Sequence, residues 1–468
     1  MIDYTGTYTD RYEISMALVY FLKNRLNERA VFDYFFRKLP FNGGYAAFAG
    51  LEDLLTTIEN LRFDDKDISY LKRTGYPDDF LDYLKDFRFT GNIYSCREGE
   101  IVFPTMPEAI VEGSIPEAQL IETLLLNILN MQTLVATKAS RMKLVANKGM
   151  LIDFGLRRAQ GPGGYYASRA AIVGGFDATS NVRAGRDYQI PISGTMAHSF
   201  IQSYDDELDA FRDFARAYPD DCVLLVDTYD TLKSGVPNAI IVGKELQAQG
   251  KKLLGIRLDS GDLAYLARET RKMLDNAGLE YVKIAASNQL DEHVIKSLIE
   301  QEAPVDIFGV GTSLATGQPD ASLDGVYKLA FATGKPRIKL SESISKTTLP
   351  FKKQVYRLVN DEGKWIGADV IALENEKYIE RMYHPFETGK KMEIGELKKE
   401  PLLELVMKDG KQCAKRRSLK EIAEYHLSRI EKLPEEHKRF TFPHIYKIGI
   451  SEALKSERDR LIAEHRSM

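Results

Sequence analysis

Cysteine is scarce in this chain, which has only Cys96, Cys222 and Cys413 among its 468 residues. The three are far apart in the sequence and odd in number, so they predict neither a disulfide framework nor a Cys-x-x-Cys metal site. No other cluster has a recognisable metal-ligand spacing, and no metal ligand is assigned. We expect a protein of the reducing cytoplasm.

Long apolar runs and an excess of one charge are also missing. Residues 1–5 have neither the basic nor the apolar region of an export signal, and no later segment sustains the apolar length needed to cross a bilayer. The formal net charge is only −4, which argues against bulk attraction to nucleic acid. We therefore expect a soluble, unexported protein that binds neither membrane nor nucleic acid and that holds any anionic ligand in a local pocket.

The chain is 44% apolar and 28% charged, which is enough apolar sequence for more than one domain. Residues 1–115 predict an N-terminal α+β domain. Within it, an aromatic strand is predicted over 31–36 and a hairpin over 92–103 that turns at 97–100.

Pro116 opens a long apolar helix that is predicted to run to about Val145, and we take 116–150 as a linking helix. Residues 326–468 predict a C-terminal region of strands and helices, which becomes highly charged and helical from Ser418 onward. Its clearest strands are expected over 353–358 and 365–372, facing each other across a turn at 360–363.

Residues 151–325 repeat one pattern, in which a short apolar run is followed by a polar cluster and an amphipathic helix. We expect seven such βα units, with strands that end near 152–155, 175–177, 192–195, 225–228, 256–260, 285–288 and 308–312. The predicted fold class is α/β: an irregular parallel β/α barrel, with the N-terminal α+β domain and the C-terminal extension packed against it. A doubly wound sheet is the alternative, but it would gather its ligand at one switch point, whereas polar residues here follow every strand.

His198 is placed by this pattern at the active edge of the barrel. The run 189–192 predicts a buried strand and 199–217 an amphipathic helix, so the imidazole follows the carboxyl end of a strand. Such a histidine could be phosphorylated, act as a base or bind a ligand. A structural histidine is the alternative for any one of the seven in the chain.

Several short motifs occur in a fixed order over most of the chain, and together they resemble the nicotinate phosphoribosyltransferase family. They are Thr-Asp-Arg-Tyr at 9–12, Phe-Phe-Arg-Lys at 35–38 with Gly43 and Gly44, Glu-Thr-Leu-Leu-Leu-Asn at 122–127, Asp-Phe-Gly-Leu-Arg-Arg at 153–158, the run 194–200, Leu-Asp-Ser-Gly-Asp at 258–262, and Phe-Gly-Val-Gly-Thr at 308–312. Enzymes of this family join nicotinate to phosphoribosyl pyrophosphate, giving nicotinate mononucleotide and pyrophosphate. They couple this transfer to ATP hydrolysis through a transient phosphohistidine.

The resemblance implies roles for four residues. His198 would be the phosphorylated histidine, with ATP as co-substrate. Phe154 and Arg157 would hold the pyridine ring, and Tyr12 of a neighbouring subunit would stack on its other face. The active enzyme would then be a homodimer with shared active sites. The alternative for each aromatic residue is an ordinary core position.

The chemistry of the transfer suggests further candidates. Departure of pyrophosphate from the anomeric carbon leaves cationic sugar character, so the site needs a cation near the leaving group and a carboxylate near the sugar. Arg257 and Asp259 are two residues apart on one strand and so share a face, although a local salt bridge would explain the pair equally well. The candidates for the 5-phosphate are Ser287, Asn288, Gly311 and Thr312, which end the last two strands of the barrel.

Ser180 is the candidate for choosing between nicotinate and nicotinamide. The matching position in related nicotinamide-using enzymes looks to be an aspartate, which would repel the carboxylate of nicotinate. A serine removes this repulsion and can donate a hydrogen bond, so the acid is favoured. Nicotinamide and quinolinate remain alternative substrates, and a non-catalytic sugar-phosphate-binding protein is the alternative of another class.

Asp227 is expected either to orient His198 or to bind magnesium, and Asp230 is as plausibly a helix cap. Magnesium is inferred only from the polyphosphate substrates. The basic stretch of Lys352, Lys353 and Arg357 is interpreted as a solvated face and is left out of the site.

Overall fold

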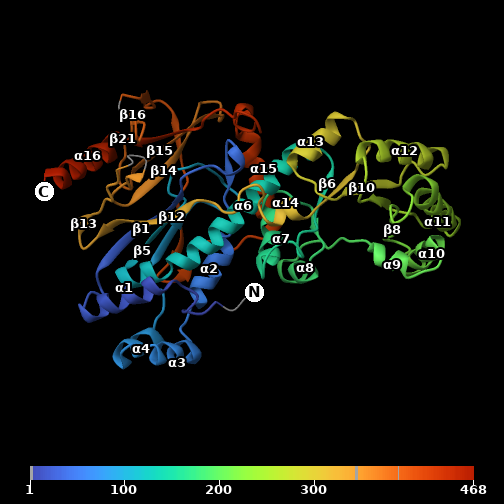
Figure 1. The fold of residues 1–468 in the computed structure, drawn as a ribbon. Coiled ribbons are helices and arrows are strands. Elements are labelled where there is room, and N and C mark those ends of the chain that lie inside the picture. The colour runs from blue at the N-terminus through green and yellow to red at the C-terminus, as the bar shows by residue number, and fades with distance from the viewer. Residues whose placement is uncertain (1–3, 343–345, 388, 468) are drawn as a thin grey trace. The chain divides into compact units, whose positions relative to one another are not determined.

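The computed structural model describes residues 4–342, 346–387 and 389–467. The chain forms two compact units. Unit 1 comprises Met1–Thr137 and Ser322–Met468, and unit 2 comprises Lys138–Ala321. Figure 1 shows the helices and strands of both units.

Unit 1 contains a seven-stranded sheet in the order β13-β12-β1-β5-β3-β19-β20. The predicted aromatic strand is confirmed as β1, which is buried along most of its length and pairs antiparallel with both β5 and β12. Strands from both ends of the chain thus share one sheet. The bounds are β1 Arg29–Phe36, β3 Asn92–Ser95, β5 Ala109–Ser114, β12 Gly325–Ala332, β13 Lys335–Pro336, β19 Glu404–Lys408 and β20 Lys411–Gln412.

The hairpin predicted over 92–103 is wrong. Its two arms are strands, but β3 pairs with β5 and β19, whereas β4 (Ile101–Val102) pairs with β2 (Ala46–Ala47). Gly99 lies between the arms with a φ of +90°, so the chain does turn there. The turn sends the two arms to different sheets.

A second, six-stranded sheet of unit 1 has the order β17-β16-β21-β15-β14-β18. Its centre is the predicted antiparallel pair of β14 and β15, which is confirmed. The turn between them is closed by a hydrogen bond from the Asn360 amide to the Lys364 carbonyl. The bounds are β14 Lys353–Val359, β15 Trp365–Leu373, β16 Arg381–Tyr383, β17 Lys391–Glu393, β18 Lys398–Pro401 and β21 Lys447–Ser451.

The basic stretch at the start of β14 is not a solvated face, and that prediction is wrong. The Lys353 ammonium is fully buried 2.8 Å from the Asp33 carboxylate. Arg357 is equally buried and pairs with Glu100 at 2.6 Å and with Asp369 at 3.0 Å. Both cations therefore form buried ion pairs inside unit 1, where a charge is tolerated because it is paired and hydrogen-bonded.

Helices make up much of the rest of unit 1. Their bounds are α1 Arg11–Leu22, α2 Leu51–Asn60, α3 Asp65–Arg73, α4 Asp78–Lys85, α5 Ile115–Leu120, α6 Glu122–Ala146, α15 Leu419–Lys432 and α16 Glu452–Ser467, with short 3-10 turns at Pro40–Asn42 and Glu435–His437. The long helix predicted from Pro116 is confirmed as α5 and α6, and α6 ends in unit 2. Contrary to expectation, the helical segment Ile115–Ala146 is long and apolar enough to cross a membrane, but 67% of its apolar window is buried inside the protein, as in the core helix of a soluble protein.

Unit 2 is built on a six-stranded parallel sheet in the order β7-β6-β11-β10-β9-β8. Apart from the gap between β7 and β8, neighbours in this sheet follow the chain order around a ring, which is the arrangement of a β/α barrel. The predicted irregular barrel is thus confirmed as a curled, incompletely closed sheet. The strands are β6 Met150–Asp153, β7 Ala178–Thr179, β8 Val223–Leu225, β9 Gly255–Leu258, β10 Lys283–Ser287 and β11 Ile307–Val310.

Helices follow the strands of unit 2, and several begin at an aspartate whose side chain accepts a backbone N–H. Asp206, Asp262 and Asp291 cap α10, α12 and α13 in this way. The helices are α7 Gly163–Val173, α8 Val182–Tyr188, α9 His198–Gln202, α10 Glu207–Ala217, α11 Val236–Ala248, α12 Leu263–Asn276, α13 Glu292–Glu300 and α14 Thr312–Ala315, and a π-helical turn spans Thr231–Gly235.

Two predictions around His198 are wrong in detail. The run 189–192 is not a buried strand: Ile192 is 60% exposed and makes only an isolated parallel bridge to Thr179. The helix predicted over 199–217 is two helices, α9 and α10, because the chain leaves the helix after Gln202 and Asp206 caps a new one. His198 is the first residue of α9.

Candidate active site

A cavity of about 710 Å³ lies at the carboxyl ends of the unit 2 strands. One wall is the segment 192–199, and the others come from β8 and β9 themselves and from the loops that follow β6, β7 and β9. The structure brings six predicted site residues together in this lining: Phe154, Arg157, Ser180, His198, Arg257 and Asp259.

The imidazole of His198 has two different surroundings. Its Nδ1 lies 3.1 Å from the Thr228 hydroxyl oxygen. Its Nε2 lies 3.8 Å from an Asp259 oxygen and 4.0 Å from an Asp227 oxygen. The side chain is 41% exposed, so the ring is held on one side and remains accessible to a ligand. The sequence analysis missed Thr228, although its place next to Asp227 at a strand end was a usable signal.

Arg257 and Asp259 form the ion pair that was the alternative reading, and they also lie on the cavity wall. The guanidinium is 2.8 Å from the Asp259 carboxylate and donates further hydrogen bonds to Ser287 at 2.8 Å and Thr195 at 3.1 Å. Burial alone would raise the pKa of Asp259, but hydrogen bonds from Ser287 and Arg257 and the positive charge of Arg257 outweigh it and lower that pKa. The carboxylate therefore stays ionised beside the cavity.

Asp227 fixes the backbone of the chain at Asp259 and Ser260. One carboxylate oxygen accepts the Asp259 backbone N–H at 2.8 Å and the Ser260 hydroxyl at 2.6 Å. The other oxygen is buried, has no hydrogen-bond partner among the described residues, and is the one that lies 4.0 Å from His198. Asp230 has the other predicted role, since its side chain accepts the Lys233 N–H and caps the π-helical turn.

Phe154 is wedged between Gly309 and Arg257. A Cβ atom at Gly309 would lie 2.3 Å from the ring, so only glycine admits the ring there. The Arg257 guanidinium lies 5.4 Å from the ring centroid, within the range of a cation–π contact. Ser180 is half-buried and Arg157 exposed, and both line the same cavity.

The candidates for the 5-phosphate lie outside the lining of the cavity. Ser287 is engaged by Arg257 and Asp259. Asn288 is exposed with a φ of +79°, and Gly311 precedes the one-turn helix α14 that Thr312 begins. These residues share the carboxyl edge of the sheet with the cavity, and their role stays a prediction.

Tyr12 belongs to unit 1, where it lies near the start of α1 and is 49% exposed. Partial burial and the nearby carboxylates of Glu122 and Glu13 raise its pKa, so its hydroxyl stays protonated. The predicted role of Tyr12 across a subunit boundary also stays a prediction.

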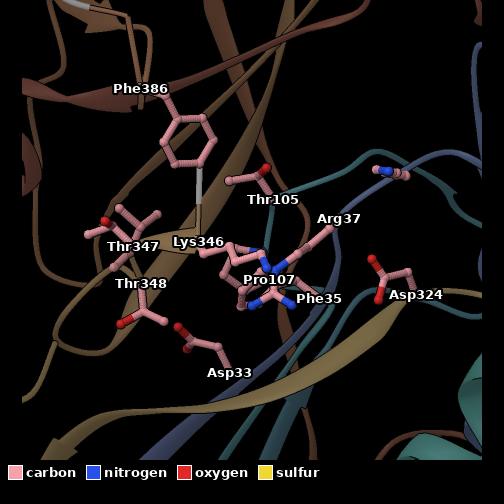
Figure 2. A pocket seen from close by; sticks show the side chains of 12 residues that line it. Asp33, Phe35, Arg37, Thr105, Pro107, Asp324, Lys346, Thr347, Thr348 and Phe386 are labelled. Carbon is pink, nitrogen blue, oxygen red and sulfur yellow. The ribbon is translucent and has the colours of Figure 1, made fainter. Parts of the chain in front are cut away.

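Unit 1 has a cavity of its own, of about 460 Å³, that the sequence analysis did not anticipate. Figure 2 shows the Arg37 guanidinium and Lys346 among the hydroxyls of Thr105, Thr347 and Thr348. Lys38 also lines this cavity. The carboxylates of Asp33 and Asp324 line it as well, so the cavity carries charges of both signs.

Known proteins similar to this chain share one family. Three family models match: the nicotinate phosphoribosyltransferase N-terminal domain over residues 7–130, the nicotinate phosphoribosyltransferase family over 150–389, and its C-terminal domain over 352–458. The chain is 44% identical to nicotinate phosphoribosyltransferase of Bacillus subtilis, over 99% of this chain and 96% of that protein, and 37% identical to that of Caenorhabditis elegans, over 95% and 91%.

Solved structures show the same similarity. Human nicotinic acid phosphoribosyltransferase superposes with a TM-score of 0.87 at 31% identity, covering 97% of this chain and 99% of that one. Nicotinate-nucleotide pyrophosphorylase from Pyrococcus furiosus superposes with a TM-score of 0.70 at 26% identity, covering 91% and 95%. This chain belongs to the nicotinate phosphoribosyltransferase family of enzymes.

Proposed function

We propose that this enzyme transfers the phosphoribosyl group of phosphoribosyl pyrophosphate to nicotinate, releasing nicotinate mononucleotide and pyrophosphate. In this reaction the ring nitrogen of nicotinate forms a bond to the anomeric carbon as the bond to the pyrophosphate oxygen breaks. The observation that carries the proposal is the convergence of Phe154, His198, Arg257 and Asp259 on one cavity.

The residues of the cavity suit each part of this transfer. The ionised Asp259 stabilises positive charge that develops on the sugar, and Arg257 offers a cation to the departing pyrophosphate. Phe154 provides a flat apolar surface for the pyridine ring. Ser180 and Arg157 are suited to its carboxylate, the first as a hydrogen-bond donor and the second as a cation.

We further propose that ATP phosphorylates His198 and that hydrolysis of the phosphohistidine favours the transfer. The γ-phosphoryl group would move from ATP to an imidazole nitrogen, with ADP as the leaving group, and water would later take the phosphoryl group as inorganic phosphate. The exposed imidazole with one hydrogen-bonded nitrogen supports this proposal. A phosphoryl group on His198 would place new negative charge next to Arg257 and Asp259, where the sugar is proposed to bind.

Magnesium fits this site as a partner of the substrate phosphates. Among the described residues no cluster of three or more His, Cys, Asp or Glu side chains could hold a metal ion by itself. Asp227 nevertheless has a buried carboxylate oxygen that no described residue hydrogen-bonds, and this oxygen lies near His198 and Asp259. One or two carboxylates with substrate phosphates are the usual ligands of Mg²⁺, which when bound would neutralise phosphate charge.

The transfer is tested by incubating the protein with nicotinate and phosphoribosyl pyrophosphate and measuring both products. Arg257→Ala should lower kcat/KM by about a hundredfold or more, since it removes a cation aimed at the leaving group. Lys272→Ala, on the exposed face of α12, is the matched loss of a cation and should leave the rate unchanged. Absence of nicotinate-dependent pyrophosphate release from the wild type would overturn the proposal.

Phosphorylation is tested separately with ATP labelled on the γ-phosphate. We expect an acid-labile phosphate on His198 of the wild type. His198→Ala should lose both the label and the ATP stimulation but retain slow transfer. A His198→Ala variant that hydrolyses ATP in normal proportion to transfer would contradict the assignment.

A further inference from the structure

Asp153, the last residue of β6, is a buried carboxylate directly behind the cavity wall, and no part of the proposed reaction uses it. Its side chain is 0% exposed. Burial raises its pKa, although three hydrogen bonds to the carboxylate oppose the rise. The donors of all three bonds are neutral, so the carboxylate acts through hydrogen bonds and not through an ion pair.

The three donors come from three different segments of unit 2. One carboxylate oxygen accepts the Gly155 backbone N–H at 2.7 Å. The other accepts the hydroxyls of Ser168 in α7 and Thr179 in β7, each at 2.7 Å. The Asp153 carbonyl in turn accepts the Ser180 backbone N–H at 2.8 Å. A single residue thus joins the loop after β6 to the loop after β7.

Asn181 extends this connection on the far side of Ser180. It is 1% exposed, its backbone N–H donates to the Thr179 hydroxyl oxygen at 3.0 Å, and its side-chain amide donates to Ser168 at 3.1 Å. Its side-chain oxygen caps α8 by accepting the Ala184 N–H. Ser180 therefore lies between two residues that are fixed by buried hydrogen bonds.

The two joined loops carry the side chains assigned to nicotinate. Phe154 and Gly155 directly follow Asp153, and Ser180 directly follows Thr179. Phe154 is also fixed from behind by Gly309, whose missing side chain leaves room for the ring. The distance between the aromatic surface and the serine hydroxyl therefore depends on the hydrogen bonds of Asp153.

We propose that Asp153 is a positioning residue for the pyridine subsite, and that with Ser168 and Thr179 it sets the spacing between Phe154 and Ser180. The inference rests on the proposed function, because it takes these two side chains as contacts of nicotinate. The network touches neither Arg257 nor His198 among the described hydrogen bonds. Its loss should therefore weaken nicotinate binding more than binding of the phosphoribosyl donor.

Thr179→Val removes one donor to Asp153 and also the acceptor of the Asn181 backbone N–H, with little change in shape, and Thr179→Ser keeps both hydrogen bonds. We expect Thr179→Val to raise the KM for nicotinate about tenfold or more, as for one or two lost buried hydrogen bonds, and to change the KM for phosphoribosyl pyrophosphate by less than about twofold. Thr179→Ser should restore the wild-type KM. Thr270→Val is the matched control, since Thr270 is also buried in unit 2 and its hydroxyl has no hydrogen-bond partner among the described residues.

Amide hydrogen exchange gives a second readout that does not depend on activity. In Thr179→Val, faster amide exchange is expected in both loops, residues 154–158 and 180–184, because the hydrogen bond between Thr179 and Asp153 that joins them is lost. Equal rises in both KM values, or faster exchange in the second loop alone, would overturn the inference. If the wild type does not use nicotinate, but Thr179→Val still speeds amide exchange in both loops, the proposed function is overturned. The connection between the two loops through Asp153 would then remain supported.

Discussion

Ser180 places a neutral hydroxyl on the cavity wall, next to two residues that buried hydrogen bonds hold in place. The hydroxyl can donate to a carboxylate, whereas a carboxylate in its place would repel one. We therefore expect the neutral side chain of Ser180 to favour nicotinate over nicotinamide on grounds of charge.

Ser180→Asp should lower kcat/KM for nicotinate relative to nicotinamide by about tenfold to a hundredfold, because two negative charges would meet in a partly buried site. Ser180→Asn has a similar size without the charge, and it separates repulsion from crowding. The measurement is kcat/KM for both substrates with each variant. An unchanged ratio in Ser180→Asp would show that this position does not select the substrate.

At the scale of residues, sequence reasoning succeeded where strand ends determine position. Arg257 and Asp259 share a face because side chains alternate along a strand, and both line the cavity. It did not anticipate Thr228, whose contact with His198 joins the loop after β8 to the start of α9, 30 residues away in the chain. It also placed Lys353 and Arg357 in solvent, since their buried partners Asp33 and Glu100 lie in a distant part of the chain.

At the scale of elements, α15 contributes a histidine that should make stability depend on pH. His426 is fully buried, and its Nδ1 lies 3.0 Å from the Gly99 carbonyl, to which it donates when neutral. Burial lowers the pKa of His426 from 6.5 to about 4. The folded protein therefore resists protonation at a site where the unfolded chain accepts a proton.

The contribution of His426 to stability is complete above pH 6.5 and is lost as the pH falls toward 4. The loss should reach about 3 kcal/mol in the free energy of unfolding. Urea unfolding at several pH values would measure it. His426→Asn keeps a donor for Gly99 and should flatten this slope, whereas His465→Asn, at an exposed position in α16, should not. Equal slopes in wild type and His426→Asn would contradict the prediction.

Which elements the sequence could predict follows from how local their pairing is. The pair of β14 and β15 was predictable because the turn at 360–363 joins adjacent strands. The arms of the expected hairpin at 92–103 pair instead with strands elsewhere in the chain, and no local pattern encodes such partners. Likewise, Ile190 and Ile192 resembled a strand, but Pro191 between them has no N–H for a ladder.

For the whole molecule, the expected homodimer with shared active sites can be tested with dimers of two different variants. If Tyr12 completes the site of its neighbour, Tyr12→Ala and Arg257→Ala damage the same site from different chains. Each variant alone should be nearly inactive. A dimer with one subunit of each kind should keep one intact site of two, and so about half of the wild-type activity.

Co-expression with two affinity tags would isolate the mixed dimer for this measurement. A mixed dimer no more active than its parents would show that Tyr12 acts within its own subunit. Full activity of Tyr12→Ala alone would show that the tyrosine is dispensable. The control is a mixed dimer of wild type and Arg257→Ala, which should also keep about half of the activity.

The gap between β7 and β8 in the parallel sheet of unit 2 determines where the cavity wall can accept changes of sequence. Where a seventh strand was expected, the chain makes one isolated bridge at Ile192 and then continues as irregular backbone along the cavity to His198. A strand paired on both sides in a barrel cannot gain residues or shift its register without breaking backbone hydrogen bonds to its two neighbours. Beyond its two backbone hydrogen bonds with Thr179, this stretch pairs with no strand among the described residues, so a change of length after Ser193 would alter the cavity wall without breaking the parallel sheet.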